Sequence, residues 1–479
     1  MPENLLSLIE TSTREELQEY IKSLMEVVAS QAKQIALLEA EVRELKEKLG
    51  TNSKNSSKPT SQEITSAPKN KAASKRRPGG QKGHPGKGRD WVEAAEVDAI
   101  HDIEPPSHCD CGATVTRSGR YLPHQTIDLP EIKVQVHEYR RHYGICTACG
   151  RVHVSDLPSG VSPSLLESRL LAFIGTLTGG YRLSKRLVQS LLYDLFKLDL
   201  SLGLISQSET EISAALAPVV EEARISIQKA PIVHCDETGA KEKGQRQWLW
   251  GAVAGTLCVF MMNVSRGAKV AKTLLGEMFA GILITDRHGA YTWVAASRRQ
   301  LCWAHLKRDF QKMVDRGGTS QPIGERLLHL LKRLFDLWQE VKADKLDLAQ
   351  FQTAMQPIQA EFEHVLQEGS RLCDGLEDKT AATCVRLLNL KEALWTFVRT
   401  PGVEPTNNTA ERSLRHYVMW RKISSGSQSP RGSLFIERIM TVVGSCKLQQ
   451  RNVLHFLTDA ITAHRAKTLA PSLVFVGEN

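Results

Sequence analysis

The stretch Pro231-Ile-Val-His-Cys-Asp-Glu-Thr-Gly239 is the most informative part of this sequence. An apolar start, an acidic pair, a turn-prone segment and a second apolar run at 248–253 predict a strand that ends in a carboxylate and then a hairpin. Because side chains alternate across a strand, Asp236 shares a face with His234, and Glu237 points the opposite way. Asp236 is therefore the better candidate for a site on that face.

Two further acids follow comparable patterns. The apolar run Gly281-Ile-Leu-Ile-Thr-Asp286 again ends in an aspartate, and Glu411 lies where residues 405–415 predict the start of a helix. Three carboxylates on two strand ends and one helix can hold two divalent ions about 3.5–4 Å apart, which supports in-line phosphoryl displacement. Magnesium suits such a site because it prefers oxygen ligands.

Each acid also has a purely structural interpretation. An aspartate after a strand commonly caps a turn. Glu411 lies three residues after Asn408, which is the capping-box spacing at a helix start. Taken singly, the three acids leave both interpretations open.

The composition indicates a multidomain protein with a polyanionic partner. The chain has 479 residues, enough for two to four domains, and 41% of them are hydrophobic. Its net charge of +9 favours a partner such as nucleic acid. The first residues lack the pattern of a secretory signal, and the apolar segment 249–264 is too short to span a bilayer. Ten cysteines, four of them closely paired, indicate metal binding in a reducing compartment. We therefore expect a cytoplasmic, nucleoid-associated protein with no membrane partner.

Residues 1–50 predict a coiled-coil oligomerisation helix. Apolar side chains recur in alternating steps of four and three, with Gln31 as the single polar member, and this period predicts a homo-oligomer. One amphipathic helix packed on its own domain is the alternative. The repeating positions are Leu17, Ile21, Leu24, Val28, Gln31, Ile35, Leu38, Val42, Leu45 and Leu49.

Residues 51–95 predict a basic flexible linker. The segment is rich in Ser, Asn, Pro, Gly and Lys, so it cannot bury enough apolar surface to fold alone. Its cations can neutralise DNA phosphates without reading the base sequence, although a charge run can also be a solvated linker. The predicted DNA-binding residues here are Lys75, Arg76, Arg77, Lys82, Lys87 and Arg89.

Residues 96–158 predict a zinc-binding module. Cys109 and Cys111 form a CxC pair, Cys146 and Cys149 form a CxxC pair, and a glycine follows each pair, as in tight metal-binding turns. Four thiolates match a closed, tetrahedral structural zinc site.

Some features of this module stay open. Alternating apolar residues at 132–139 predict a strand between the two cysteine pairs. Because CxC is less common than CxxC, a histidine can replace one cysteine ligand, and a redox role of the CxxC pair is a weaker alternative. The histidines concerned are His108, His142 and His153.

Residues 159–229 predict a helical region. The pattern indicates a helix over about 165–177 that breaks at Gly179-Gly180, then helices over about 184–198 and 201–213. Ser201 and Ser206 are candidate caps. The second break, between the helices at about 184–198 and 201–213, is compatible with a helix-turn-helix that recognises DNA. It is also compatible with two helices that only pack against each other.

From Pro231 onwards the predicted order is three strands, a helix at about 268–279, two strands and a long helix that opens near Gln300. This is the element order of an RNase H-like fold. The chain resembles bacterial insertion-sequence transposases of the DDE type, in the TnpC-type group (insertion-sequence family sixty-six), over nearly its whole length. The matching stretches are Asn52-Ser-Lys-Asn-Ser-Ser-Lys-Pro59, His234-Cys-Asp-Glu-Thr238, Thr285-Asp286, Cys302-Trp-Ala-His305, Asn407-Asn-Thr-Ala-Glu-Arg-Ser-Leu-Arg415 and Arg421-Lys422.

The resemblance implies that Asp236, Asp286 and Glu411 are catalytic and bind two magnesium or manganese ions. It implies that a water attacks a phosphodiester at the element's end and that the freed 3′-hydroxyl then attacks target DNA. Cys302 and His305 match a signature of uncertain role, with core packing at a helix start as the alternative. Residues expected near DNA phosphates are Arg412, Arg415, Arg421 and Lys422.

We therefore predict an α/β RNase H-like catalytic domain preceded by the coiled coil, the zinc module and the helical DNA-binding region. The expected function is strand cleavage and strand transfer in DNA transposition, with proteins encoded by the same element as candidate accessory partners. An RNase H-like nuclease that does not join strands and a non-catalytic DNA-binding regulator are the competing functions. The predicted catalytic segments are a first core part (230–322), a helical insertion (323–403), and a last core part with C-terminal helices (404–479).

Overall fold

The computed structural model describes residues 13–49, 90–158, 161–372, 378–424 and 426–474. The chain divides into two compact units, one formed by Met1–Thr65 and Glu138–Asn479 and the other by Ser66–His137. The cations predicted to bind DNA in the basic linker, from Lys75 to Arg89, lie outside the described residues.

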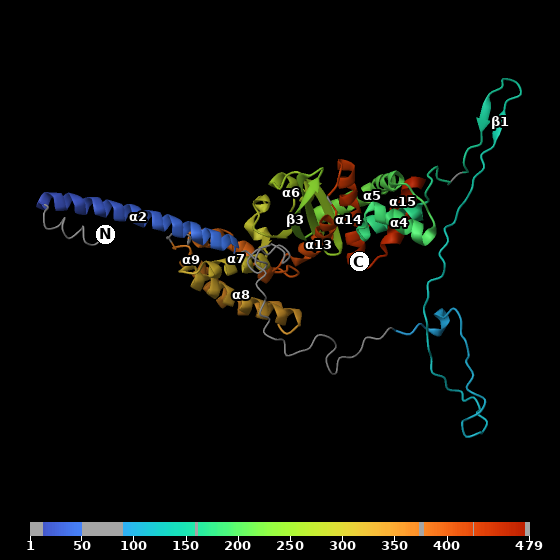
Figure 1. Cartoon of the computed structure of the whole chain (residues 1–479), viewed down its shortest axis with the longest axis horizontal. Helices are drawn as coiled ribbons and strands as arrows, with labels where there is room; N and C mark the ends of the chain where they lie inside the picture. Colours follow the sequence, from blue (N-terminus) through green and yellow to red (C-terminus); the bar gives the residue numbers. More distant parts are fainter. Residues whose placement is uncertain (1–12, 50–89, 159–160, 373–377, 425, 475–479) are drawn as a thin grey trace. The chain divides into compact units, whose positions relative to one another are not determined.

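The first unit is a mixed α/β structure (Figure 1). Its helices and strands are α2 (Arg14–Leu49), β1 (Tyr143–Ile145), β2 (Val152–Val154), α3 (Ser168–Gly175), η3 (Thr176–Gly180), α4 (Lys185–Phe196), α5 (Leu202–Lys229), β3 (Ile232–Glu242), β4 (Gln245–Ala254), β5 (Leu257–Asn263), α6 (Ala268–Leu275), β6 (Ile282–Thr285), η4 (Gly289–Tyr291), η5 (Ala296–Arg298), β7 (Arg299–Leu301), α7 (Trp303–Arg316), α8 (Ser320–Lys342), α9 (Leu348–Gly369), α10 (Asp378–Asn389), α11 (Lys391–Leu394), α12 (Thr396–Arg399), α13 (Asn408–Ile423), α14 (Pro430–Leu448) and α15 (Val453–Ala466).

Five strands form one mixed sheet in the order β5-β4-β3-β6-β7. β3, β4 and β5 pair antiparallel as two successive hairpins, whereas β6 and β7 continue the sheet in parallel with β3. This element order was predicted from the sequence. One detail of the prediction was wrong: β3 does not end at Asp236 but runs on to Glu242, because its pairing with β4 continues through those residues.

The two faces of the sheet pack against different helices. Val233 and Cys235 of β3 belong to a large core with side chains from α5, α6 and α14. Ala240 on the opposite face of β3 joins Leu249 of β4 in a smaller core that also contains Leu414 of α13. Since residues 234, 236, 238 and 240 share one face of a strand, the side chain of Asp236 lies on the α13 side of the sheet.

The helices α4, α5 and α6 differ from the prediction in their lengths. Ser184 and Ser201 cap α4 and α5, because their side chains accept the amides of Leu187 and Leu204. Ser201 was a predicted cap, but Ser206 lies inside α5. The expected helix over 201–213 in fact continues to Lys229. α6 ends earlier than expected, at Leu275 rather than near residue 279.

A long helical segment, which contains the range 323–403 that was predicted as an insertion, separates β7 from α13. Its helices α7 to α12 enclose a second hydrophobic core, which includes Ile284 of β6, Leu301 of β7 and Trp303 of α7. The insertion therefore completes the packing of the β6–β7 edge of the sheet and is not a separate appendage.

The N-terminal helix α2 is a single helix of 36 residues, as the repeat predicted. Several of its apolar side chains are exposed, including Ile21, Leu24, Val28 and Ile35. No helix in the described ranges combines the length and the apolar character that a membrane crossing requires.

Candidate active site

The end of β6 brings two aspartates together. Ile232, Val233 and His234 of β3 pair in parallel with Ile282, Leu283 and Ile284 of β6. Asp236 lies two residues further along β3, on the same face as His234, and Asp286 directly follows the last residue of β6. Each carboxylate accepts one local amide, Asp236 from Glu237 at 2.9 Å and Asp286 from His288 at 2.8 Å. In both cases the donor is a backbone amide one or two residues further along the chain, so the local backbone orients each carboxylate.

Glu411 reaches this face from the first turns of α13. The helix begins after Asn407, so Glu411 is the fourth helical residue, and its backbone amide bonds to the carbonyl of Asn407. The capping-box alternative does not apply here, because Asn407 is the N-cap and makes no side-chain cap. The Glu411 carboxylate instead lies 3.5 Å from a ring nitrogen of His305 and 3.9 Å from Arg308.

Asp236 is buried among other acidic side chains that influence its charge. Burial raises the pKa of Asp236 well above its ordinary value, and the charges of Glu237, Asp286 and Glu411 raise it further. Like charges within several ångströms act in this way when water is excluded. A polyvalent cation at this position would relieve that repulsion.

Glu237 lies on the other face of β3, as predicted from strand alternation. Its side chain is fully buried and binds Arg266 at 2.7 Å. The hydroxyl of Tyr291 donates to its second oxygen. His288 lies 3.8 Å from the same carboxylate, so with three partners of its own Glu237 is a structural acid rather than a member of the carboxylate group on the α13 side.

Asn407 links three elements beneath the carboxylates. Its side-chain amide donates to the carbonyl of Cys235 at 2.8 Å, its side-chain oxygen lies 3.2 Å from His234, and its backbone amide donates to the sulfur of Cys302 at 3.1 Å. The residue is fully buried. Sequence reasoning missed this role: Asn407 was quoted only as part of a motif, and no local signal separates it from Asn408.

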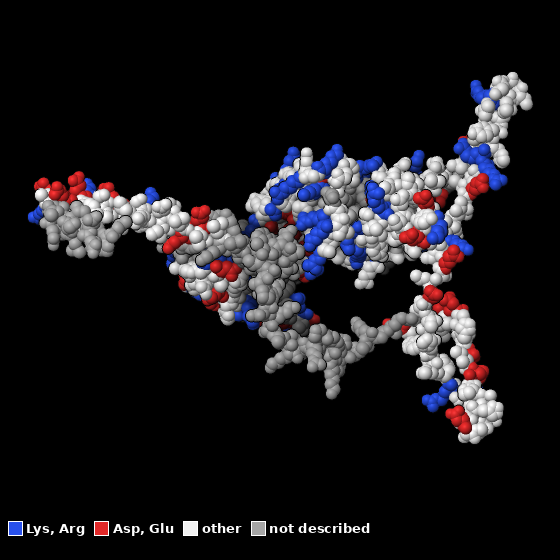
Figure 2. All heavy atoms as spheres, in the orientation of Figure 1, with Lys and Arg blue, Asp and Glu red and all other residues white. Residues whose placement is uncertain are grey.

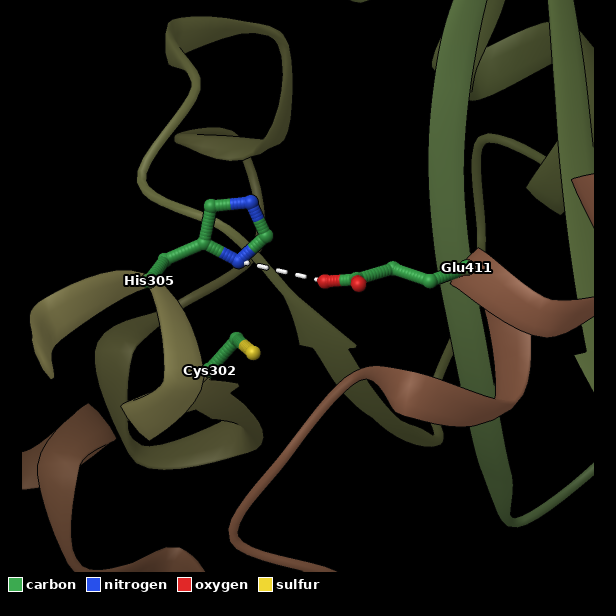
Figure 3. Close-up of side chains that lie close together, drawn as sticks. All are labelled: Cys302, His305 and Glu411. Carbon is green, nitrogen blue, oxygen red and sulfur yellow. Dashed lines mark ion pairs between the residues drawn. The ribbon is translucent and has the colours of Figure 1, made fainter. Parts of the chain in front are cut away.

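Cys302 and His305 flank Glu411 at the start of α7 (Figure 3). The Cys302 sulfur, a His305 ring nitrogen and a Glu411 oxygen all lie within 4.8 Å of one another. Burial raises the pKa of the Cys302 thiol to about 11. Burial, and then the charge of Arg308, lower the pKa of His305, which favours its neutral imidazole. The predicted packing at a helix start holds for Cys302, whereas His305 faces a carboxylate.

The basic residues predicted on α13 are all exposed. Arg421 bonds to the carbonyl of Gly239 on β3, and Arg412 to the hydroxyl of Thr409 at 3.1 Å. Arg415 and Lys422 are exposed on the same helix. Figure 2 shows Lys and Arg side chains gathered over the α/β core, in the region where Figure 1 labels α6, β3 and α13.

The two cysteine pairs form similar turns. The backbone amide of Gly112 bonds to the carbonyl of Cys109, and that of Gly150 bonds to the carbonyl of Cys146. Both glycines adopt positive φ, at 86° and 68°. Hydrogen bonds from the backbone amides of Cys111 and Cys149 lower the pKa of Cys109 and Cys146, respectively.

The pairs belong to different units, Cys109 and Cys111 to the second and Cys146 and Cys149 to the first. Their union in one site therefore remains a prediction. The expected strand at 132–139 is absent from the structure, which places β1 and β2 on either side of the CxxC pair instead. Apolar alternation at 132–139 had no partner strand with which to pair.

Comparison with known proteins gives a consistent result. A family model described as "Transposase IS66 family" matches residues 166–434, more than half of the chain. A second model, described as a family of unknown function (DUF6444), matches residues 7–90. Two relatives in Sinorhizobium fredii (strain NBRC 101917 / NGR234), the uncharacterized proteins y4qI and y4hP, are each 24% identical to this chain. The alignments cover 77% and 78% of this chain and 73% of each relative.

The family match covers the sheet, the carboxylates and the helical insertion, and it ends early in α14. It confirms the resemblance that the motifs around Asp236, Asp286 and Glu411 indicated. On this match, the chain belongs to the IS66 family of transposases.

Proposed function

We propose that this chain is a DDE transposase whose Asp236, Asp286 and Glu411 bind two divalent ions and support both strand cleavage and strand transfer. The observation that carries the proposal is the parallel pairing of β3 with β6, which places Asp236 and Asp286 at neighbouring strand positions, with α13, the helix of Glu411, packed on the Asp236 face of the sheet. The raised pKa of Asp236 supports it: burial is the main cause, the charges of Glu237, Asp286 and Glu411 add to it, and a bound cation would offset that negative charge. The strand order also agrees with an RNase H-like fold.

The roles of the residues follow from their surroundings. The carboxylates offer only oxygen ligands, which is the donor set that magnesium prefers. When bound, two such ions activate the attacking oxygen and stabilise the leaving oxygen of an in-line displacement. Arg412, Arg415, Arg421 and Lys422 on α13 supply positive charge for the phosphate backbone. Asn407 and the first turn of α13 hold Glu411 opposite the two aspartates.

The test is cleavage and joining of the element's own DNA ends. Purified full-length protein, magnesium and oligonucleotides copied from the DNA that flanks its gene are incubated, and products are resolved on a sequencing gel. Asp236→Asn and Glu411→Gln should each reduce both products at least about 100-fold, as loss of a metal ligand does in such sites. Asp459→Asn, which changes an exposed acid of α15, is the matched control and should behave as the wild type.

The other outcomes separate the competing functions. Cut but unjoined ends would favour the nuclease, and unchanged cleavage by Asp236→Asn would overturn the catalytic assignment. Tight DNA binding without any product, persisting after the neighbouring gene products are added, would favour the non-catalytic regulator.

We further propose that Cys109, Cys111, Cys146 and Cys149 bind one structural zinc ion. Two glycine-containing turns with amide-stabilised sulfurs support this proposal, because such turns are typical of zinc-binding cysteine pairs. Zinc content of the full chain should fall by one equivalent in a Cys146→Ser/Cys149→Ser variant. An unchanged content would refute the site.

A further inference from the structure

A second cluster of ligand atoms overlaps the carboxylate group. It consists of the Cys302 sulfur, a His305 ring nitrogen and a Glu411 oxygen, within 4.8 Å of one another (Figure 3). Cys302 is the N-cap of α7 and His305 lies in its first turn, so both residues are placed by the start of that helix. Glu411 completes the group from α13.

Two of these atoms are unsatisfied. Nδ1 of His305 and Oε1 of Glu411 are both buried, and neither has a hydrogen-bond partner among the described residues. They lie 3.5 Å apart. Because a buried polar atom without a hydrogen-bond partner is unfavourable, a ligand bound between these atoms would satisfy both of them.

The sulfur lies among backbone amides. The backbone amide of Asn407 donates to Sγ of Cys302 at 3.1 Å. The backbone amides of His305 and Ala304, at the start of α7, also form hydrogen bonds with this sulfur. These contacts hold the sulfur at the start of α7, on the side of the helix that faces α13, where a thiol group can serve as a metal ligand.

We propose that Cys302, His305 and Glu411 bind a zinc ion, separate from the two-magnesium site but sharing Glu411 with it. Thiolate, imidazole and carboxylate are the three ligand types that zinc accepts, whereas magnesium binds sulfur and nitrogen poorly. Three protein ligands leave the fourth tetrahedral position for water or a phosphate oxygen. Zinc held here would keep Glu411 at α7, where its Oε1 already lies 3.5 Å from His305, and would therefore compete with magnesium for this carboxylate. This last consequence rests on the proposed function.

The test measures metal content directly. Full-length protein is equilibrated with micromolar zinc and no magnesium, desalted, and analysed for zinc per chain. Wild type should retain one zinc more than Cys302→Ser. Because the paired cysteines elsewhere are unchanged, any zinc they bind cancels in this comparison. Cys384→Ser, which removes another buried free thiol, is the control and should match the wild type.

His305→Gln is a second, independent test of the site, in case Cys302→Ser misfolds. It should lose the same zinc equivalent, and circular dichroism should show both variants folded. Equal zinc contents in wild type, Cys302→Ser and His305→Gln would overturn the proposal. Cobalt can replace zinc as a spectroscopic probe. The thiolate-to-cobalt absorption should lose the contribution of one sulfur ligand in Cys302→Ser and stay unchanged in Cys384→Ser.

A second readout links the site to activity. Zinc should inhibit magnesium-dependent cleavage by wild type and by Cys384→Ser, and excess magnesium should restore it. Each protein is compared with its own zinc-free activity. The zinc concentration that halves this activity should be at least about tenfold higher for Cys302→Ser than for the wild type. Equal inhibition of all three proteins would overturn the link to Glu411. If no variant cleaves DNA, the proposed function fails, and the zinc contents still decide whether the site exists.

Discussion

The side-chain amide of Asn407 bonds to the backbone carbonyl of Cys235 at 2.8 Å, one residue before Asp236. Asn407 also precedes the first residue of α13, the helix that carries Glu411. One buried side chain therefore fixes the distance between the strand of one candidate ligand and the helix of another.

Asn407→Ala should impair both stability and catalysis. The change leaves the carbonyl of Cys235 and the ring of His234 without their partner in the interior, which should cost roughly 2 kcal/mol of unfolding free energy. Cleavage should fall at least tenfold, because small displacements of a ligand are costly in a preorganised site. The neighbouring Asn408→Ala, on an exposed residue, should leave both properties unchanged. Similar behaviour of the two variants in thermal unfolding and cleavage would contradict the positioning role.

The adjacent acids Asp236 and Glu237 should respond differently to neutralisation. Asp236→Asn removes a charge that Glu237, Asp286 and Glu411 repel, so the unfolding temperature in EDTA should not fall, whereas cleavage should be lost. Glu237→Gln removes the charge of a buried carboxylate that pairs with the partly exposed Arg266 and should lower that temperature, corresponding to about 1–3 kcal/mol. Calorimetry of the two variants checks this. A strongly destabilised Asp236→Asn would argue that this carboxylate is structural.

Glu437 should make stability depend on pH. This residue of α14 accepts the amide of Met262 at 2.9 Å, and burial raises its pKa from 4.5 to about 7. The folded chain holds the proton more tightly than the unfolded chain, so the stabilisation is complete below about pH 4.5 and is lost as pH rises to about 7.

Glu437→Gln keeps an oxygen acceptor for Met262 but removes the titration. Its unfolding free energy should therefore decline less than that of the wild type between pH 5 and pH 8, by up to roughly 3 kcal/mol. Denaturant unfolding at several pH values measures the difference. Parallel pH profiles for the two proteins would show that burial of Glu437 is not the cause.

The exposed apolar positions of α2 should drive self-association. Leu24→Lys/Val28→Lys introduces two charges into the repeat and should shift the full chain to a smaller species in light scattering. Ser23→Lys/Ser30→Lys adds the same charge at exposed positions outside the repeat and should not. If the first variant keeps the mass of the wild type, α2 is not the oligomerisation element.

The parts of the fold that depend on local patterns were predictable. Strand alternation placed Asp236 and Glu237 on opposite faces, and the heptad repeat gave the extent of α2 within a few residues. Apolar runs of matching design identified β6 and its terminal Asp286. These signals are carried by neighbouring residues, so a single sequence contains them.

Features that depend on distant contacts were not predictable. The helix that was predicted to break at Gly179-Gly180 does end at Gly180, but no signal in the sequence indicated that Gly179 packs against α14. A β-carbon on Gly179 would lie 2.2 Å from Ile439, so the glycine permits two helices to approach. The burial of Asn407 rather than Asn408 likewise depends on where residues far away in the chain meet. Ser206 looked like a cap, but packing extended α5 through it.

The bond between the Asn407 amide and the Cys302 sulfur joins residues 105 positions apart in the chain. Contacts across such separations form late, because the intervening chain must first lose its conformational freedom. During synthesis the ribosome releases both aspartates long before Glu411, and the segment between them must fold before α13 can dock. A nascent or truncated chain thus carries two of the three proposed ligands and no completed site. The order of translation itself would then keep an unfinished transposase from cutting DNA.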